Sequence, residues 1–120
     1  MAGRWTVEFY EDESGCPVRQ FLDELPTPKR AKLLALIRLL EEQGPTLPFP
    51  YSSQIRGKLR ELRTRFGDEH LRMLYFGAPG RTFVLLHAFS KRTEKVPQGD
   101  LASAEARMKR YLERRQERKP

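Results

Sequence analysis

Three strand patterns follow one another closely in the middle of the chain, and this feature constrains the fold more than any other. They occupy residues 58–66, 71–76 and 82–89. The second pattern is apolar apart from Arg72, and the third is apolar apart from Thr82 and His87. Glycine-containing turns separate them, and strands joined by turns this short pair antiparallel. The segment therefore predicts a three-stranded meander.

Helix and strand patterns flank the meander on both sides. Residues 5–10 alternate like a half-buried strand, and apolar side chains recur at helical spacing in residues 17–25, 27–43 and 101–112. The stretch 45–57 contains three prolines, which predicts an irregular connection. A basic tail follows from about residue 113. The order strand, helix, helix, three strands, helix predicts an α+β fold with a small antiparallel sheet, as one domain over residues 1–120.

Charge and cysteine content narrow the classes of function. The net charge of +7 and the isoelectric point near 9.9 favour a nucleic-acid partner, although an acidic protein partner or a role in solubility requires no other composition. Cys16 is the only cysteine, and together with the two histidines it provides too few ligands for a zinc site. We therefore expect neither disulfide nor metal nor other cofactor. No apolar run has the length of a membrane span or an export signal, so a cytoplasmic location is expected.

The first strand of the meander is unusually basic. Side chains alternate across a strand, so Arg63 and Arg65 share one face with Glu61, whereas Leu62 and Phe66 share the other. One face can bury its apolar side chains in a core. The opposite face then presents guanidinium groups to an anionic partner.

Two further candidates interrupt the apolar strands. Arg72 is the one charged residue inside its strand, and its alternative role is that of an arginine on an exposed strand face, paired with Glu61 or Glu69. His87 is a candidate general acid or base, although a lone histidine in an apolar strand is commonly a satisfied core residue. His70 is expected to be a turn residue without a role.

A charged loop follows the last strand of the meander. It carries Lys91, Arg92 and Lys95. These residues can meet a phosphate if the loop lies beside the meander, and otherwise they form an ordinary solvated loop. Tyr75 and Phe89 could stack on bases, but both are expected to lie mainly in the core.

The order of these pieces resembles the RelE/ParE superfamily of bacterial toxins, and within it the phage-derived HigB-type branch. The matching pieces are residues 5–10, 17–25, 57–63, 71–76 and 86–97, followed by a helix with Ala104 and Tyr111. The resemblance implies an antiparallel sheet with helices against one face and a basic concave surface on the other. It also implies the toxin of a type II toxin-antitoxin system, a ribosome-dependent endoribonuclease that cuts messenger RNA and is neutralised by a cognate helix-turn-helix antitoxin.

The chemistry of RNA cleavage assigns roles to the charged residues. Without a metal it requires deprotonating a 2′-hydroxyl, stabilising charge at phosphorus and protonating the 5′-oxygen, and arginine suits only the second task. The resemblance places Arg72 against the scissile phosphate, with Arg63 and Arg92 also holding phosphate. The candidates for proton transfer are Lys91, Lys95 and His87. A tyrosine that some RelE relatives carry is absent after Arg92, which leaves the acid and the base open.

Other basic residues are expected to bind RNA through charge alone. They are Arg65 on the basic strand and Arg107, Lys109 and Arg110 on the last helix, although that helix face is also consistent with simple solvation. Messenger RNA on the ribosome, ribosomal RNA and the antitoxin are the expected partners, and no membrane is involved. Two alternatives remain open: a ParE-like poison of DNA gyrase, and a basic RNA-binding module without catalysis.

Overall fold

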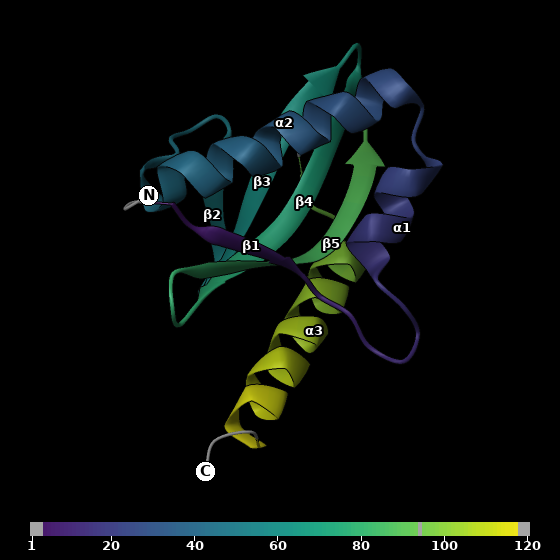
Figure 1. Ribbon diagram of the computed structural model, residues 1–120. Helices are drawn as coiled ribbons and strands as arrows, with labels where there is room; N and C mark the ends of the chain where they lie inside the picture. The colour runs from purple at the N-terminus through teal and green to yellow at the C-terminus, as the bar shows by residue number, and fades with distance from the viewer. Residues whose placement is uncertain (1–3, 94, 118–120) are drawn as a thin grey trace.

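The computed structural model describes residues 4–93 and 95–117, and within these it contains a five-stranded sheet and three α-helices (Figure 1). In chain order the elements are β1 (Thr6–Phe9), α1 (Pro17–Glu24), α2 (Thr27–Gln43), the 3₁₀ helix η1 (Gly44–Thr46), β2 (Ser52–Arg56), β3 (Leu59–Phe66), β4 (Glu69–Ala78), β5 (Thr82–Lys91) and α3 (Gln98–Glu117). The α+β class predicted from the sequence is confirmed.

The sheet has the strand order β1-β5-β4-β3-β2. β3, β4 and β5 pair antiparallel as the predicted meander, and β2 continues the antiparallel pattern at one edge. At the other edge β1 runs parallel to β5, with Thr6 opposite Thr82 and Phe9 opposite Leu85. The sheet is therefore mixed at this one edge, a detail that alternation within a single strand cannot reveal.

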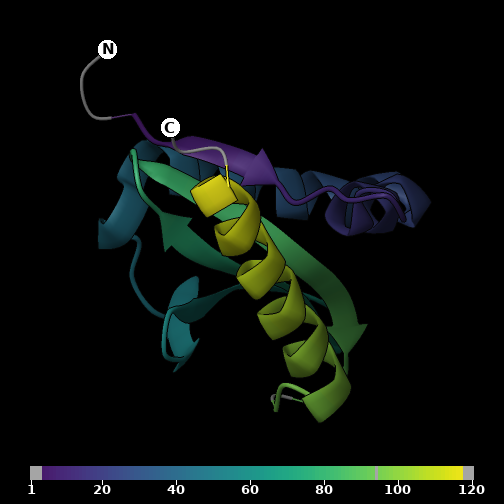
Figure 2. The same cartoon turned by 90° about the horizontal axis from the view of Figure 1, so that it is seen from below.

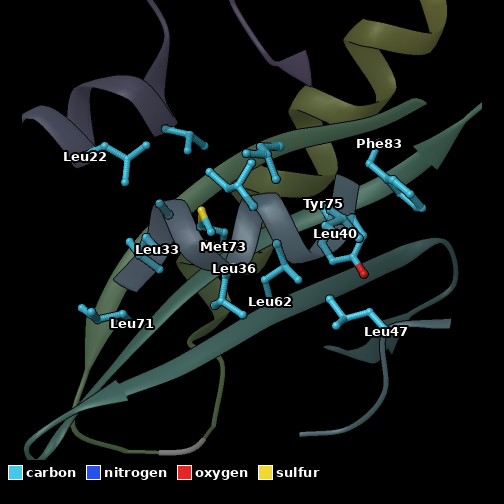
Figure 3. Packing of buried hydrophobic residues seen from close by; sticks show 14 residues of the cluster. Leu22, Leu33, Leu36, Leu40, Leu47, Leu62, Leu71, Met73, Tyr75 and Phe83 are labelled. Carbon is cyan, nitrogen blue, oxygen red and sulfur yellow. The ribbon is translucent and has the colours of Figure 1, made fainter. Parts of the chain in front are cut away.

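Helices α1 and α2 cover one face of the sheet, which we call the α2 face (Figure 1). Its core consists mainly of leucines from the helices and alternate residues of β3, β4 and β5 (Figure 3). α1 begins at Pro17 and α2 has Pro28 as its second residue, and proline suits the first turn of a helix because its missing N–H has no intrahelical acceptor there. α2 ends at Gly44, whose φ of 56° is left-handed, and a Cβ there would overlap the Trp5 indole.

Helix α3 lies on the opposite face, the α3 face, and packs chiefly on β5 and β4 (Figure 2). Its core brings Leu101 and Ala104 of the helix against alternate residues of the strands, among them Leu74, Phe76 and Val84. The structure thus differs from the expectation of helices on one face only, because α3 covers part of the face that was expected to stay open.

The segment 45–57 is more regular than its prolines suggest. It contains the end of η1 and all of β2, so the prediction of an irregular connection throughout is wrong. The strand begins after the last proline, and Ser52 to Gln54 pair with Leu62 to Arg60 of β3. Pairing with β3 supplies the backbone partners, which the polar composition of β2 did not indicate.

Three boundaries also differ from the sequence-based prediction. β4 begins at Glu69, so His70 is a buried strand residue and not a turn residue. β5 extends to Lys91, which therefore lies on the strand and not in the following loop. α3 continues to Glu117, so the predicted tail is helical up to that residue, and residues 118–120 lie outside the described part. Within that part, no helix is both long and apolar enough to cross a membrane.

Candidate functional site

The register of β3, β4 and β5 arranges the candidate residues in three rows on the α3 face. Residues opposite one another on adjacent strands lie close together, since the strands are about 4.8 Å apart. The rows are Arg65, His70 and Lys91; Arg63, Arg72 and Phe89; and Glu61, Leu74 and His87. The fold therefore brings four of the six predicted catalytic residues onto one face, although they are far apart in the sequence.

Arg72 lies at the centre of these rows and is completely buried, with 0% of its surface exposed. Its guanidinium donates to Glu61 Oε2 at 3.2 Å and to the carbonyl oxygen of Thr93 at 3.1 Å. Glu61 is only 3% exposed, so the two residues form a buried ion pair. The structure gives Arg72 one of the two carboxylate partners proposed from the sequence, but on a buried and not an exposed strand face. Arg72 thereby links β3 to the segment after β5.

Arg63 lies beside Arg72 and is half-buried. Its backbone N–H donates to the carbonyl oxygen of Tyr51 at 2.9 Å, and its guanidinium carbon lies 5.7 Å from the centre of the Phe49 ring. The arginine therefore stands between a buried cation on one side and two aromatic residues on the other. Its side chain keeps enough exposure to reach a bound anion.

The segment after β5 adds exposed cations at the same end of the sheet. Arg92 and Lys95 are both exposed. The Arg92 charge contributes to lowering the pKa of the Glu69 carboxyl, although the ammonium of Lys29 and then the hydroxyl of Ser90 have the larger effects. Ser90 Oγ donates to Glu69 Oε2 at 2.7 Å. Arg92 is thus near Glu69 at the start of β4, at the same end of the sheet as Lys91, although the two partners of Glu69 lie toward the α2 face.

His87 is held from two sides. Its Nε2 lies 2.6 Å from Asp100 Oδ1, and its Nδ1 lies 2.8 Å from a guanidinium nitrogen of Arg107. Because arginine can only donate, Nδ1 accepts and Nε2–H donates to Asp100. A β-bulge beside Leu74 allows Leu86 and His87 both to face α3. This geometry favours the alternative of a satisfied residue that fastens α3 to β5.

The basic residues predicted to bind RNA lie in different surroundings. Arg65 and Lys109 are exposed. Arg107 points toward the sheet, where it also donates to the carbonyl oxygen of Leu86 at 3.0 Å. Arg110, about one helical turn after Arg107, pairs with Asp12 at 3.8 Å. The predicted basic helix face is therefore divided between Arg107, which bonds the sheet, and Arg110, which pairs with the segment after β1.

Sequence reasoning missed two aromatic residues next to Arg63. Phe49 is 70% exposed and Tyr51 is 46% exposed, and neither was among the candidate residues drawn from the sequence. Tyr75 and Phe89, the two aromatics considered for stacking, are 2% and 6% exposed and belong to the core as expected. The flanking prolines were a signal that the segment is stiff, but no local pattern shows whether an aromatic ring points inward or outward.

A cavity of about 810 Å³ lies at a different place, between the residues from Glu8 to Glu13 and the second half of α3. Tyr111 donates to Glu8 at 3.1 Å, and the Arg114 guanidinium lies 5.1 Å from the centre of the Tyr10 ring. Burial and then the carboxylate of Glu8 raise the pKa of Tyr111. We call this place the α3–β1 cavity, and its walls already pair acidic with basic groups.

The surface formed by Arg63, Arg65, Lys91 and Arg92, with Arg72 buried beneath, is called the arginine surface below. Its cations suit an oxyanion ligand, because guanidinium groups match the geometry of phosphate and remain charged at any physiological pH. The assignment of individual catalytic residues on this surface stays a prediction.

Comparison with known protein families matches most of the chain to a family model. Residues 20–109, three quarters of the chain, match the model of the family described as "Phage derived protein Gp49-like (DUF891)". The match contains the arginine surface and the first half of α3. A search of curated proteins gave no significant match. The chain therefore belongs to the Gp49-like family of phage-derived proteins, which is part of the RelE-like toxin group.

Proposed function

We propose that this protein is the toxin of a type II toxin-antitoxin system, of the HigB type, and that it cleaves messenger RNA on the ribosome. The observation that carries this proposal is the arginine surface, where two strand arginines lie opposite one another and further cations follow on β5 and beyond. Membership in the Gp49-like family and the net charge of +7 support the same conclusion.

The proposed reaction is attack of a 2′-hydroxyl on the adjacent phosphate, which releases the 5′-oxygen of the next nucleotide. Arg63 and Arg92 are exposed enough to hold the phosphate and to stabilise the charge that develops at phosphorus. Lys91 and Lys95 remain the candidates for acid and base, and both are exposed, so their side chains can reach a bound substrate. His87 is a weaker candidate because both ring nitrogens are engaged.

Arg72 takes a different role in this proposal. A buried arginine bonded to Glu61 and to the Thr93 carbonyl acts on the substrate through the segment that it holds. We therefore describe it as a positioning residue, which fixes the chain just after Arg92. Replacing it by lysine keeps the charge but removes the planar fork that bonds two partners at once.

The partners follow from the same proposal. Messenger RNA in the decoding site is the substrate, and Arg65, Lys109 and Arg110 are candidates for contact with ribosomal RNA through charge. A small helix-turn-helix protein is the expected antitoxin, and both act in the cytoplasm. Arg107 is no longer a good candidate for RNA contact, because its guanidinium bonds the β5 backbone and His87.

The test is induced expression followed by mapping of messenger 5′ ends, with the same variants assayed in a translating extract. Arg63→Ala and Arg92→Ala should each reduce cleavage about 100-fold, the decrease typical of removing one electrostatic stabiliser. The control is Arg38→Ala, which removes an exposed arginine from α2 on the opposite face. Thermal unfolding of each variant separates loss of activity from loss of fold.

Two outcomes would contradict the proposal. Arrested growth with intact messenger and a DNA-damage response would favour a gyrase poison. RNA binding without cleavage or toxicity would favour a basic binding module. If both arginine variants cleave as well as the Arg38→Ala control, the site assignment is wrong even if the nuclease activity is real.

A further inference from the structure

Phe49 and Tyr51 form an exposed aromatic pair on the segment between η1 and β2. Among the described residues, the large hydrophobic side chains that are clearly exposed are Leu34, Phe49 and Tyr51. A single exposed apolar residue requires no explanation. Two aromatic residues separated by one proline, on the border of a basic surface, form a more specific arrangement.

The backbone holds this pair in place. The N–H groups of Tyr51 and Ser52 both donate to the carbonyl oxygen of Pro48, at 3.0 and 3.1 Å. The carbonyl oxygen of Tyr51 in turn accepts the N–H of Arg63 at 2.9 Å. Pro48 and Pro50 restrict the backbone on either side of Phe49. The segment that carries the two rings therefore loses little backbone conformational entropy when a ligand packs against them.

The pair adjoins a cation suited to phosphate. The Arg63 guanidinium lies 5.7 Å from the centre of the Phe49 ring, and Arg63 is the direct neighbour of Tyr51 across the strands. An aromatic plane beside an arginine suits both parts of what a single-stranded nucleotide presents, a base with a π-face and a charged phosphate. A membrane core or an apolar protein surface would match the rings but not the positive charge beside them.

We propose that Phe49 and Tyr51 are a stacking platform for the bases of single-stranded RNA, next to a phosphate bound at Arg63. The inference deepens the proposed function and rests on it, since it concerns how the same surface holds its substrate. Stacking tolerates any base because every base has a π-face. The platform therefore contributes affinity and orientation, and it contributes little choice among bases.

The test measures binding apart from cleavage. A short fluorescent RNA with 2′-O-methyl groups cannot undergo the reaction, and its anisotropy reports affinity at low salt. Phe49→Ala with Tyr51→Ala should weaken binding at least tenfold, the decrease expected for removing a stacking partner. Leu34→Ala is the matched control, because Leu34 is exposed to the same 46% as Tyr51 but lies on α2. Phe49→Trp should bind at least as well as wild type.

A second oligonucleotide, with abasic sites in place of bases, identifies the contact. It should bind the wild type more weakly than the full RNA, and the double variant should bind both oligonucleotides equally well. The inference is overturned if the double variant binds like the Leu34→Ala control, if the abasic penalty persists in it, or if the wild type fails to bind RNA at low salt. The first of these results would indicate that the rings contact a protein.

The proposed function can fail separately. Wild-type protein that leaves messenger intact, but depends on the two rings for RNA binding, would disprove the nuclease and retain the platform. Protein that cleaves messenger equally with and without the two rings would retain the nuclease and disprove the platform.

Discussion

The arginine surface and the α3–β1 cavity both place arginines beside aromatic rings, but they differ in the proportion of cationic and carboxylate side chains among the described residues that form them. The three rows on the sheet hold four cations, Arg63, Arg65, Arg72 and Lys91, and one carboxylate, Glu61. The cavity is lined by three arginines and four carboxylates. Its volume makes it the more obvious hollow. An excess of cations, and not a hollow, is what an anionic polymer requires, so the comparison supports the arginine surface over the cavity as the place of the proposed RNA binding.

The largest expected effect concerns the buried pair at the centre of the arginine surface. Glu61→Gln leaves the fully buried Arg72 beside a neutral amide in place of a carboxylate, and breaking such a pair typically costs about 3–5 kcal/mol. Urea unfolding measures the decrease in the free energy of unfolding. Glu105→Gln is the control, since its pair with Arg56 at 3.4 Å is exposed and contributes little. Equal stability of the two variants would show that the Arg72 pair is not structural.

The second effect compares one arginine from each region. Arg63→Ala should weaken binding of single-stranded RNA. The slope of log affinity against log salt concentration should become shallower by about 0.7 for each phosphate that the variant no longer neutralises. Arg114→Ala removes an arginine that contacts the Tyr10 ring and the Glu11 carbonyl oxygen, and it should leave the salt dependence unchanged. Affinities at several salt concentrations give both slopes. Identical slopes would mean that RNA does not distinguish the two regions.

Much of the fold followed from periodicity, because α1 and α2 each bury residues at the helical spacing seen in the sequence. β2 did not, since the sequence Ser52-Ser53-Gln54 has no apolar alternation and its strand conformation depends on pairing with β3. The place of α3 was also hidden, because an amphipathic helix shows which side is apolar but not which face of a sheet it covers.

The candidate site was predictable in part. The basic residues of β3 and the segment after β5 were visible as charge, and the sheet brings them to one end. Burial of Arg72 was not visible, because the sequence offered Glu61 as a partner but did not show that the segment after β5 also contacts this face of the sheet. The position of Phe49 beside Arg63 was hidden for a similar reason, because residues 49 and 63 meet only when the segment before β2 lies along β3.

A smaller effect, on folding stability at alkaline pH, is expected from the two tyrosines of the α3–β1 cavity. The pKa of Tyr10 is raised chiefly by burial and then by Asp12, and that of Tyr111 chiefly by burial and then by Glu8, both from 10.0. A tyrosine pKa that is raised in the folded state stabilises the protein at pH values below the ordinary pKa of tyrosine. That contribution disappears as the pH rises above about 10 through the folded pKa.

Unfolding temperatures measured from pH 8 to 11 test this sign. Tyr111→Phe cannot ionise at this position, so its stability should fall less steeply above about pH 10 than that of the wild type. The control is Tyr51→Phe, which removes an exposed phenol on the other region. A steeper alkaline fall in the Tyr111→Phe variant would contradict the assigned cause.

The smallest effect tests whether neutralisation alone separates the two regions. Glu11, Asp12 and Glu13 follow β1 and face Arg110, Arg114 and Arg115 across the cavity. Replacing the three carboxylates by Gln, Asn and Gln leaves the arginines in place and gives the cavity a cation excess like that of the rows. Affinity for single-stranded RNA should then rise roughly twofold at low salt and return to the wild-type value as salt screens the added field.

The increase in affinity should not depend on the bases of the RNA, because the exposed Phe49 and Tyr51 lie at the arginine surface and not at the cavity. The abasic RNA should therefore bind more tightly by the same factor. If the triple variant binds no more tightly at low salt, geometry and not charge excess distinguishes the two regions, and the case for the arginine surface would rest on its aromatic border.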